Sequence, residues 1–470
     1  MGEELWRHGA GELAAMIASK QVSSREVVDA HLDRISEVNP HLNAIVRVLA
    51  DEARAGADAA DVAQAGGALL GPLHGVPFTI KENIDVADTP TTNSLPAMAE
   101  AVATVDAPIV ERMRAAGAIP IGRTNLPDLG LRISTSSTLH GLTRNPWHPD
   151  RTAGGSSGGE GSALASGMSP IGLGNDIGGS LRNPAHCCGI ASIKPTMLRV
   201  PNATMIAPED GSLTVQFMLS QGPMARSVAD VRLGLRTIAG AHRRDPYSAP
   251  VPLDGIGSVT GPFRVGVVTD PAGSPTHSSV SATVRTAADG LSAAGHQVSD
   301  VELPHFADIA RLWSAWLNAD VRMMLPILEM VMGQSALTFL KSIEEASPPT
   351  TLEQYIGMQT ERQTIARMWS AFFADYDAVI LPVWTQPAFE HDADIASVDA
   401  ALHTIDQLRP ALPANYLGIP AAVVPGAVHD GLPMGVQVLA DRWHDLTALA
   451  VAEEIERSVG RFTPIDPVLA

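Results

Sequence analysis

The chain has 470 residues, 45% hydrophobic and 18% charged, which is typical of a globular protein with a large core. The formal net charge of -19, spread without a basic block, argues against a nucleic-acid partner, because it would repel polyphosphate. The only cysteines, Cys187 and Cys188, are adjacent and provide neither a disulfide framework nor a four-cysteine zinc site. An acidic N-terminus and the absence of a long apolar run predict a cytoplasmic protein without a membrane segment.

Helical and strand-like segments alternate along the first 200 residues. Residues 23–38 have helical spacing and begin at a Ser and Glu pair that can cap a helix, and Asn39-Pro40 predicts its end. Further predicted elements are a strand over 75–80, a helix over 106–116, a strand over 118–123, a helix over 161–168 and a strand over 170–174. Between them, residues 131–161 are rich in Gly, Ser and Thr, as in a long functional loop.

The alternation resumes in the second half of the chain. The predicted elements are strands over 263–268, 296–303, 377–382, 421–425 and 435–439, with helices over 280–295, 305–374 and 445–458. No repeat, low-complexity tract or linker divides the sequence. We therefore expect one α/β domain over residues 1–470.

Glycines surround three polar positions that could carry chemistry: Lys81, the Ser156-Ser157 pair in GGSSGGEG, and Ser180 at the end of DIGGS. Glycines allow backbone N–H groups to approach a substrate closely. In acyl transfer, such donors stabilise the oxyanion by roughly 2.7 to 4 kcal/mol each. The backbone of Ile177, Gly178 and Gly179, next to the Ser180 hydroxyl, is a candidate oxyanion hole.

Lys81 is the candidate base for a serine nucleophile. Only four of the 32 Lys and Arg residues are lysines, so a retained Lys suggests a task that guanidinium cannot perform, such as losing its proton. Burial after the apolar strand would lower its pKa from about 10.4 and favour the neutral amine. Glu82 and Asp85 would oppose this, but in an extended segment Glu82 points away from Lys81.

Each of these motifs also has a simpler interpretation. GGSSGG alone is more often a linker, and a lone Lys after a strand is usually solvated. GGSSG also fits a nucleophile elbow with Ser156 as nucleophile and Asp430 and His444 as partners, but no strand precedes it. A phosphate-binding loop is excluded because the Gly-Lys-Ser/Thr ending is missing.

The segment GGSSGGEGSALASGMSPIGLGNDIGGSLRNPAHCCGIASIKPT (154–196), with GVPFTIKENIDV upstream, resembles the amidase signature family. The similarity extends to RTNLPDLG, HGLTRNPW, LSQGPMARSVAD and NYLGIPAAVVPGAVHDGLPMGVQVL, and so covers most of the chain. It implies a single domain with a mixed, mostly parallel sheet covered by helices on both sides. Residues 300–375 would be a variable helical specificity region.

The family's residues are carried over where the motif matches. The resemblance implies that Ser180 is the nucleophile, that Ser156, in an unusual cis peptide, relays its proton, and that Lys81 is the base. The implied oxyanion donors are the backbone of Ile177, Gly178, Gly179 and Ser180, and the supporting residues are Asp176, Arg182 and Ser157. Departures from the family pattern are Asn175, Glu82, Ser192 and Ser136-Ser137, none of which removes a catalytic atom.

The substrate is expected to be an apolar or aryl amide, while esters and carbamates, a urethanase activity, remain open. Gly130, Ser136 and Trp384 are candidate substrate contacts, and most methionines of 316–333 are expected in the core. The sequence also leaves open a tRNA-linked glutamine amidotransferase subunit or a non-catalytic binding protein. No metal or organic cofactor is implied, because no His or Cys cluster has ligand spacing. A homodimer is implied by resemblance alone.

Overall fold

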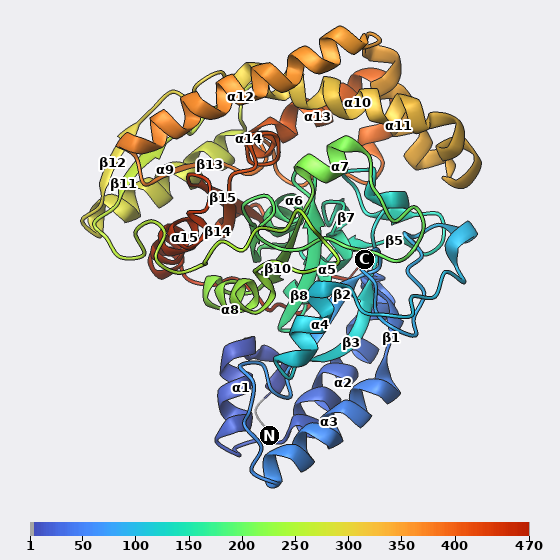
Figure 1. Cartoon of the computed structure of the whole chain (residues 1–470). Helices are drawn as coiled ribbons and strands as arrows, with labels where there is room; N and C mark the ends of the chain where they lie inside the picture. Colours follow the sequence, from blue (N-terminus) through green and yellow to red (C-terminus); the bar gives the residue numbers. More distant parts are fainter. Residues whose placement is uncertain (1–3, 470) are drawn as a thin grey trace.

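A mixed sheet of 11 strands forms the centre of the molecule in the computed structural model, which describes residues 4–469 (Figure 1). In order across the sheet the strands are β1 (Ile45–Val48), β3 (Ile119–Thr124), β2 (Pro77–Lys81), β8 (Ile171–Asp176), β10 (Ser220–Ala225), β9 (Ala191–Lys194), β14 (Ala421–His429), β15 (Leu432–Leu439), β13 (Ala378–Pro382), β11 (Arg264–Val267) and β12 (Gln297–Asp300). The predicted α/β class and the single sheet-centred domain are confirmed.

The balance of strand directions differs from the expectation of a mostly parallel sheet. Four neighbouring pairs are parallel: β2 with β3 and β8, and β11 with β12 and β13. The other six pairs are antiparallel. The antiparallel pairing of β14 and β15 follows from the turn between them. Asp430 and Gly431 both have positive φ, at 49° and 77°, as a two-residue hairpin turn requires.

Helices cover both faces of the sheet, as predicted. One face packs against α1 (Ala10–Ala18), α4 (Pro108–Ala115), α8 (Val228–Ile238), α9 (Ser278–Ala293) and α15 (Asp445–Val459). The other face packs against α5 (Gly158–Ala165), α6 (Arg182–Cys188), α13 (Val398–Leu408) and α14 (Leu412–Leu417). Side chains alternate along each strand: in β13, Ala378 and Ile380 face the first layer, whereas Val379 and Leu381 face the second.

Residues 300–375 form three long helices above the second face: α10 (Phe306–Val331), α11 (Gln334–Ala346) and α12 (Leu352–Asp375) (Figure 1). The short α7 (Leu213–Met218) lies beside α10. The expectation that most methionines of 316–333 are core residues holds for only half of them: Met324 and Met332 pack in a hydrophobic cluster, whereas Met323 and Met330 are 73% and 76% exposed. No helix within residues 4–469 combines the length and apolar character of a membrane span.

At the N-terminal end, α2 (Ser24–Leu42) and α3 (Ala50–Ala65) pack together beside β1 and β3. The predicted capping box at the start of α2 is present, with Ser23 and Glu26 bonding each other's backbone N–H. The predicted stop at Pro40 is wrong, because a proline in the last turn removes only one hydrogen-bond donor. The helix ends instead at Leu42 and is followed by Asn43 in the left-handed region. Asn39 Oδ1 accepts the N–H groups of the next two residues, Ala44 and Ile45.

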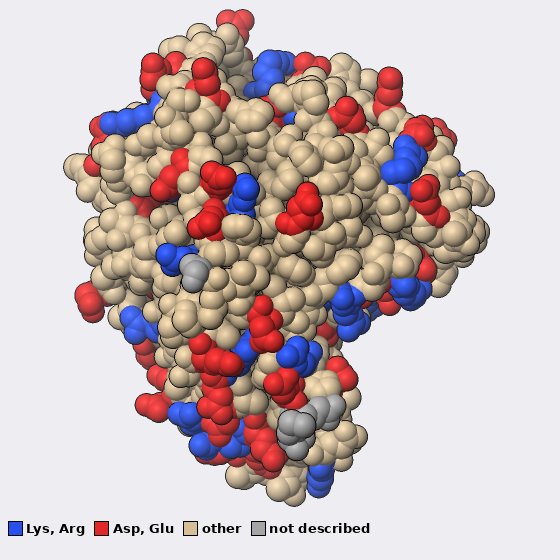
Figure 2. All heavy atoms as spheres, turned by 180° about the vertical axis from the view of Figure 1, so that it is seen from behind, with Lys and Arg blue, Asp and Glu red and all other residues tan. Residues whose placement is uncertain are grey.

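The long segment predicted as irregular contains two small hairpins, β4 (Ser136–Ser137) with β5 (Gly141–Leu142) and β6 (Arg144–Asn145) with β7 (His148–Thr152). On the face shown in Figure 2, acidic and basic side chains are interspersed, and the basic ones form no continuous area.

Candidate active site

The site lies where two neighbouring parallel strands end at the same edge of the sheet. β2 pairs with β8 through Thr79 with Gly172 and Ile80 with Leu173. Lys81 is the last residue of β2, and Asp176 is the last residue of β8. Because parallel strands share a direction, Lys81 and the turn that follows Asp176 meet at that edge, as in other α/β sheets.

Lys81 is fully buried and has two polar partners. Its Nζ donates to the Oγ of Ser156 and to the Oδ1 of Asn175, both at 2.8 Å. Burial lowers the pKa of Lys81 to about 7, against the opposing charges of Asp176 and Glu160. The amine is therefore able to exchange a proton near neutral pH.

The two carboxylates nearest to Lys81 in sequence bond elsewhere, which removes the main objection to Lys81 as a base. Glu82 Oε2 lies 2.7 Å from His140 Nε2. Asp85 accepts the Thr204 hydroxyl at 2.9 Å and the Met205 N–H. Lys81 and Glu82 thus have different partners, as expected if their side chains point in different directions.

Two glycines lie directly next to Ser156: Gly155 precedes it in the chain, and Gly130 approaches its hydroxyl. The Gly155–Ser156 peptide bond is cis, as the resemblance implied. Gly130 has φ of 69°, and a Cβ at this position would lie 3.2 Å from Ser156 Oγ. Next to it, the Ser157 N–H donates to the Ser180 carbonyl at 3.3 Å, which ties the start of α5 to the turn after β8.

A buried ion pair braces the turn that carries Ser180. Asp176 accepts the Gly179 N–H at 2.7 Å and the Leu181 N–H at 3.0 Å. Its carboxylate also accepts Arg182 Nη2 and Asn415 Nδ2, both at 2.9 Å. Arg182 holds the pKa of Asp176 well below its usual range despite burial. The supporting roles predicted for Asp176 and Arg182 agree with this geometry.

The backbone of the turn offers donors, but not all of those predicted. Because the Gly179 N–H is directed at Asp176, it is not free to bind an oxyanion in this structure. The N–H groups of Ile177, Gly178 and Ser180 have no hydrogen-bond acceptor among residues 4–469. We therefore retain these three as candidate donors and leave out Gly179.

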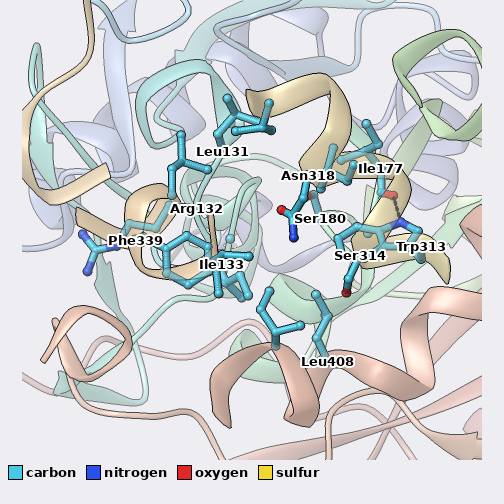
Figure 3. A pocket seen from close by; sticks show the side chains of 18 residues that line it. Leu131, Arg132, Ile133, Ile177, Ser180, Trp313, Ser314, Asn318, Phe339 and Leu408 are labelled. Carbon is cyan, nitrogen blue, oxygen red and sulfur yellow. Dashed lines mark hydrogen bonds between the residues drawn. The ribbon is translucent and has the colours of Figure 1, made fainter. Parts of the chain in front are cut away.

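Trp313 of α10 fixes the same turn from outside the sheet. Its Nε1 donates to the Ile177 carbonyl at 3.0 Å (Figure 3). A Cβ on Gly178 would lie only 2.4 Å from the Trp313 ring, so the ring packs directly on the backbone of that glycine. The helical region over 300–375 is thereby in contact with the candidate oxyanion hole.

Ser180, which is 9% exposed, lies on the wall of an apolar cavity. Figure 3 shows apolar side chains around this space, contributed by the 131–133 loop, α10, α11 and α13. The apolar lining includes Leu131, Ile133, Ile177, Trp313, Phe339 and Leu408. A cavity with this lining suits an apolar or aromatic group.

The structure does not bring the three candidate substrate contacts together at the cavity. Gly130 lines the cavity, but Ser136 and Trp384 do not. Ser136 pairs with Leu142 in the β4–β5 hairpin, and Trp384 is fully buried, with its Nε1 donating to Gln407 Oε1 at 3.1 Å. The nucleophile elbow also fails, because Asp430 lies in the β14–β15 turn and His444 bonds the Arg442 carbonyl.

Sequence reasoning missed the α10 and α11 residues that line the cavity. Trp313, Leu317 and Val321 lie four residues apart and share one face of α10. Their spacing marks an apolar face, but nothing in the sequence distinguishes a face toward a cavity from one toward the core.

The chain is similar over most of its length to known proteins. The Amidase family model matches residues 26–449. The indoleacetamide hydrolase of Bradyrhizobium diazoefficiens is 41% identical over 466 residues, covering 97% of this chain and 87% of the relative. A glutamyl-tRNA(Gln) amidotransferase subunit of Synechococcus sp. is 32% identical over 95% of this chain and 96% of its own.

Among solved structures, a bacterial aryl acylamidase of the amidase signature family superposes with a TM-score of 0.84 at 27% identity, covering 97% of both chains. The fold, the glycine-rich segments and these matches lead to one conclusion. The chain belongs to the amidase signature family.

Proposed function

We propose that this amide hydrolase cleaves apolar or aryl carboxylic amides through an acyl-enzyme on Ser180, with Ser156 as proton relay and Lys81 as base. The observation that carries the proposal is the 2.8 Å hydrogen bond from Lys81 Nζ to Ser156 Oγ, made by a lysine whose pKa is about 7. A buried amine next to a hydroxyl, away from a direct carboxylate partner, is a recognised way to activate a serine.

In the proposed acylation step, the Ser180 oxygen attacks the amide carbonyl while its proton passes to Ser156, whose own proton passes to neutral Lys81. The carbonyl oxygen becomes an oxyanion that the N–H groups of Ile177, Gly178 and Ser180 stabilise. The proton then returns through Ser156 to the leaving nitrogen as the C–N bond breaks. Water attacks the ester by the same route and releases the acid.

The apolar cavity supports an aryl or apolar substrate. Residues 300–375 contribute much of its wall, which is consistent with a specificity region. The similar indoleacetamide hydrolase and aryl acylamidase act, by their names, on amides with an aromatic part. Because the same acyl transfer serves esters and carbamates, we include these as side activities, the latter as a urethanase.

The test compares wild type with Ser180→Ala on p-nitroanilides, p-nitrophenyl esters and aryl carbamates, with product release as the readout. The proposal predicts product release by wild type alone. The ratio of the catalysed to the uncatalysed rate should be largest for aromatic or apolar amides. Equal release by both proteins would mean that Ser180 is not the nucleophile.

A second candidate function, as part of an amidotransferase, is favoured by the 32% identity to a glutamyl-tRNA(Gln) amidotransferase subunit. That role requires a different partner chain together with a route for ammonia. Copurification from the native host would reveal a heteromeric partner, whereas a homodimer, which stays a prediction, would elute as two copies of this chain. Efficient hydrolysis of simple amides by the isolated chain favours the first candidate.

A further inference from the structure

The wall of the Ser180 cavity is mostly apolar. Apart from Ser180 itself and Arg132, whose guanidinium bonds Asp392 and Asp394, its polar side chains lie on a short stretch of α10. Ser314 and Asn318, one helical turn apart, present polar side chains among Trp313, Leu317 and Val321. Figure 3 shows the side chain of Asn318 projecting from α10 toward the space between the 131–133 loop and α13. A polar group at such a position determines which substrates fit, because burying it without a partner costs free energy.

Hydrogen bonds behind α10 fix which end of the Asn318 amide faces the cavity. The Ser347 hydroxyl, at the end of α11, donates its only proton to the Ile343 carbonyl at 2.7 Å. Its oxygen can therefore only accept from Asn318, whose Nδ2 lies 2.8 Å away. The amide nitrogen is thus committed to Ser347, and Oδ1 is left as the free end.

Ser347 itself is firmly held. Its carbonyl accepts Arg322 Nη2 at 2.9 Å, and its N–H donates to the Glu344 carbonyl at 3.1 Å. The platform that orients Asn318 therefore does not depend on a substrate. Among residues 4–469 no donor bonds Asn318 Oδ1, so the free oxygen is a ready acceptor.

We propose that Asn318 is a specificity-determining residue, whose Oδ1 selects amides that carry a hydrogen-bond donor, such as a hydroxyl or ring N–H, on the group that fills the cavity. This inference rests on the proposed function only for its readout in turnover. A methyl ether or N-methyl group at the same position has no proton to donate to Asn318 Oδ1. Its methyl group also clashes with this oxygen, so both effects weaken binding.

Ser314 and Asn318 also line a groove on the outer side of α10, between α11 and α12. Solvent from this groove is the competing partner for Asn318 Oδ1. If water satisfies the oxygen as well as a substrate does, then donor-bearing and donor-free amides are treated alike, which is a measurable outcome.

The experiment uses phenylacetamide, its 2-, 3- and 4-hydroxy derivatives and their methyl ethers. We expect at least one hydroxy compound to exceed both its methyl ether and phenylacetamide in kcat/KM by roughly 3- to 10-fold, the effect of one neutral hydrogen bond. Asn318→Leu, similar in volume, should bring these ratios to about 1. Ser314→Ala, in the same wall, is the matched control and should keep the ratios.

Ser347→Ala, outside the cavity, tests the orientation separately, because it releases the amide to rotate and should weaken the penalty on the methyl ethers. Ratios near 1 in wild type, or ratios that persist in Asn318→Leu, would overturn the inference.

Kd values for the same compounds with Ser180→Ala separate binding from chemistry. A donor preference in Kd without turnover by wild type would support the inference and refute the proposed function. Turnover of all these compounds at similar kcat/KM would refute the inference and support the proposed function.

Discussion

Lys81 Nζ and Ser156 Oγ lie 2.8 Å apart, while the carboxylate of the next residue, Glu82, bonds His140. The nearest carboxylate in sequence is therefore not a hydrogen-bond partner of the amine. The remaining nearby carboxylates, Asp176 and Glu160, are bonded to other groups, and burial of Lys81 outweighs their charges.

The first prediction concerns pH. Only neutral Lys81 accepts a proton, and its pKa is lowered to about 7, so kcat/KM should be low below this pH, rise through it and level off above. Lys81→Met should remove the activity at every pH. The measurement is kcat/KM for an anilide from pH 5 to 9. A pH-independent profile for wild type would contradict the role of Lys81.

The second prediction concerns Glu160, whose pKa burial raises to about 7 and which accepts hydrogen bonds from Thr79 and Thr124. Its charge raises the pKa of Lys81, so Glu160→Gln should move the midpoint of the pH profile to lower values. Glu82→Gln is the matched control, because Glu82 faces His140, and it should leave the midpoint in place. A shift to higher pH in Glu160→Gln would contradict this electrostatic coupling.

The third prediction concerns the buried brace. Arg182→Met leaves the Asp176 carboxylate buried without its ion-pair partner, which should reduce the free energy of unfolding by roughly 3 to 5 kcal/mol. Chemical denaturation with a circular dichroism readout measures this. Arg236→Met, which breaks an exposed pair with Asp254, should change stability far less. Similar losses in both variants would refute a special role of the brace.

The fourth prediction concerns the contact between α10 and the turn. Gly178→Ala places a Cβ against the Trp313 ring, so either the ring or the turn must move. Displacing backbone donors from the oxyanion should lower kcat by at least about 10-fold, with a smaller effect on KM. The double variant Gly178→Ala/Trp313→Ala restores the space and should recover part of the kcat. Unchanged kinetics in the single variant would show that Gly178 lies outside the oxyanion hole.

Much of the sheet could be predicted from sequence because its inner strands are short apolar runs next to Gly or Pro. β2, β3, β8, β13, β14 and β15 all fall on predicted segments. Strand direction could not be predicted from the alternation alone, since it depends on pairing between distant segments. The Asp430-Gly431 turn was the one local signal available for an antiparallel pair.

The centre of the site was predictable because glycine-rich segments and the family resemblance mark Lys81, Ser156 and Ser180. The residues that line the rest of the cavity could not be predicted in this way. Trp384, a candidate substrate contact, packs in the core against Phe389, and helices α10 and α11 contribute to the cavity wall instead. Similarly, the Gly179 N–H is a donor by sequence, but its direction depends on the Asp176 carboxylate.

The role of Ser180 is tested most directly by covalent labelling with a serine-directed fluorophosphonate, followed by intact mass and peptide mapping of wild type, Ser180→Ala and Ser156→Ala. We expect one adduct on Ser180 in wild type, none in Ser180→Ala, and slower labelling of Ser180 in Ser156→Ala. An adduct on Ser156, or undiminished labelling of Ser180→Ala, would contradict the assignment of Ser180 as the nucleophile.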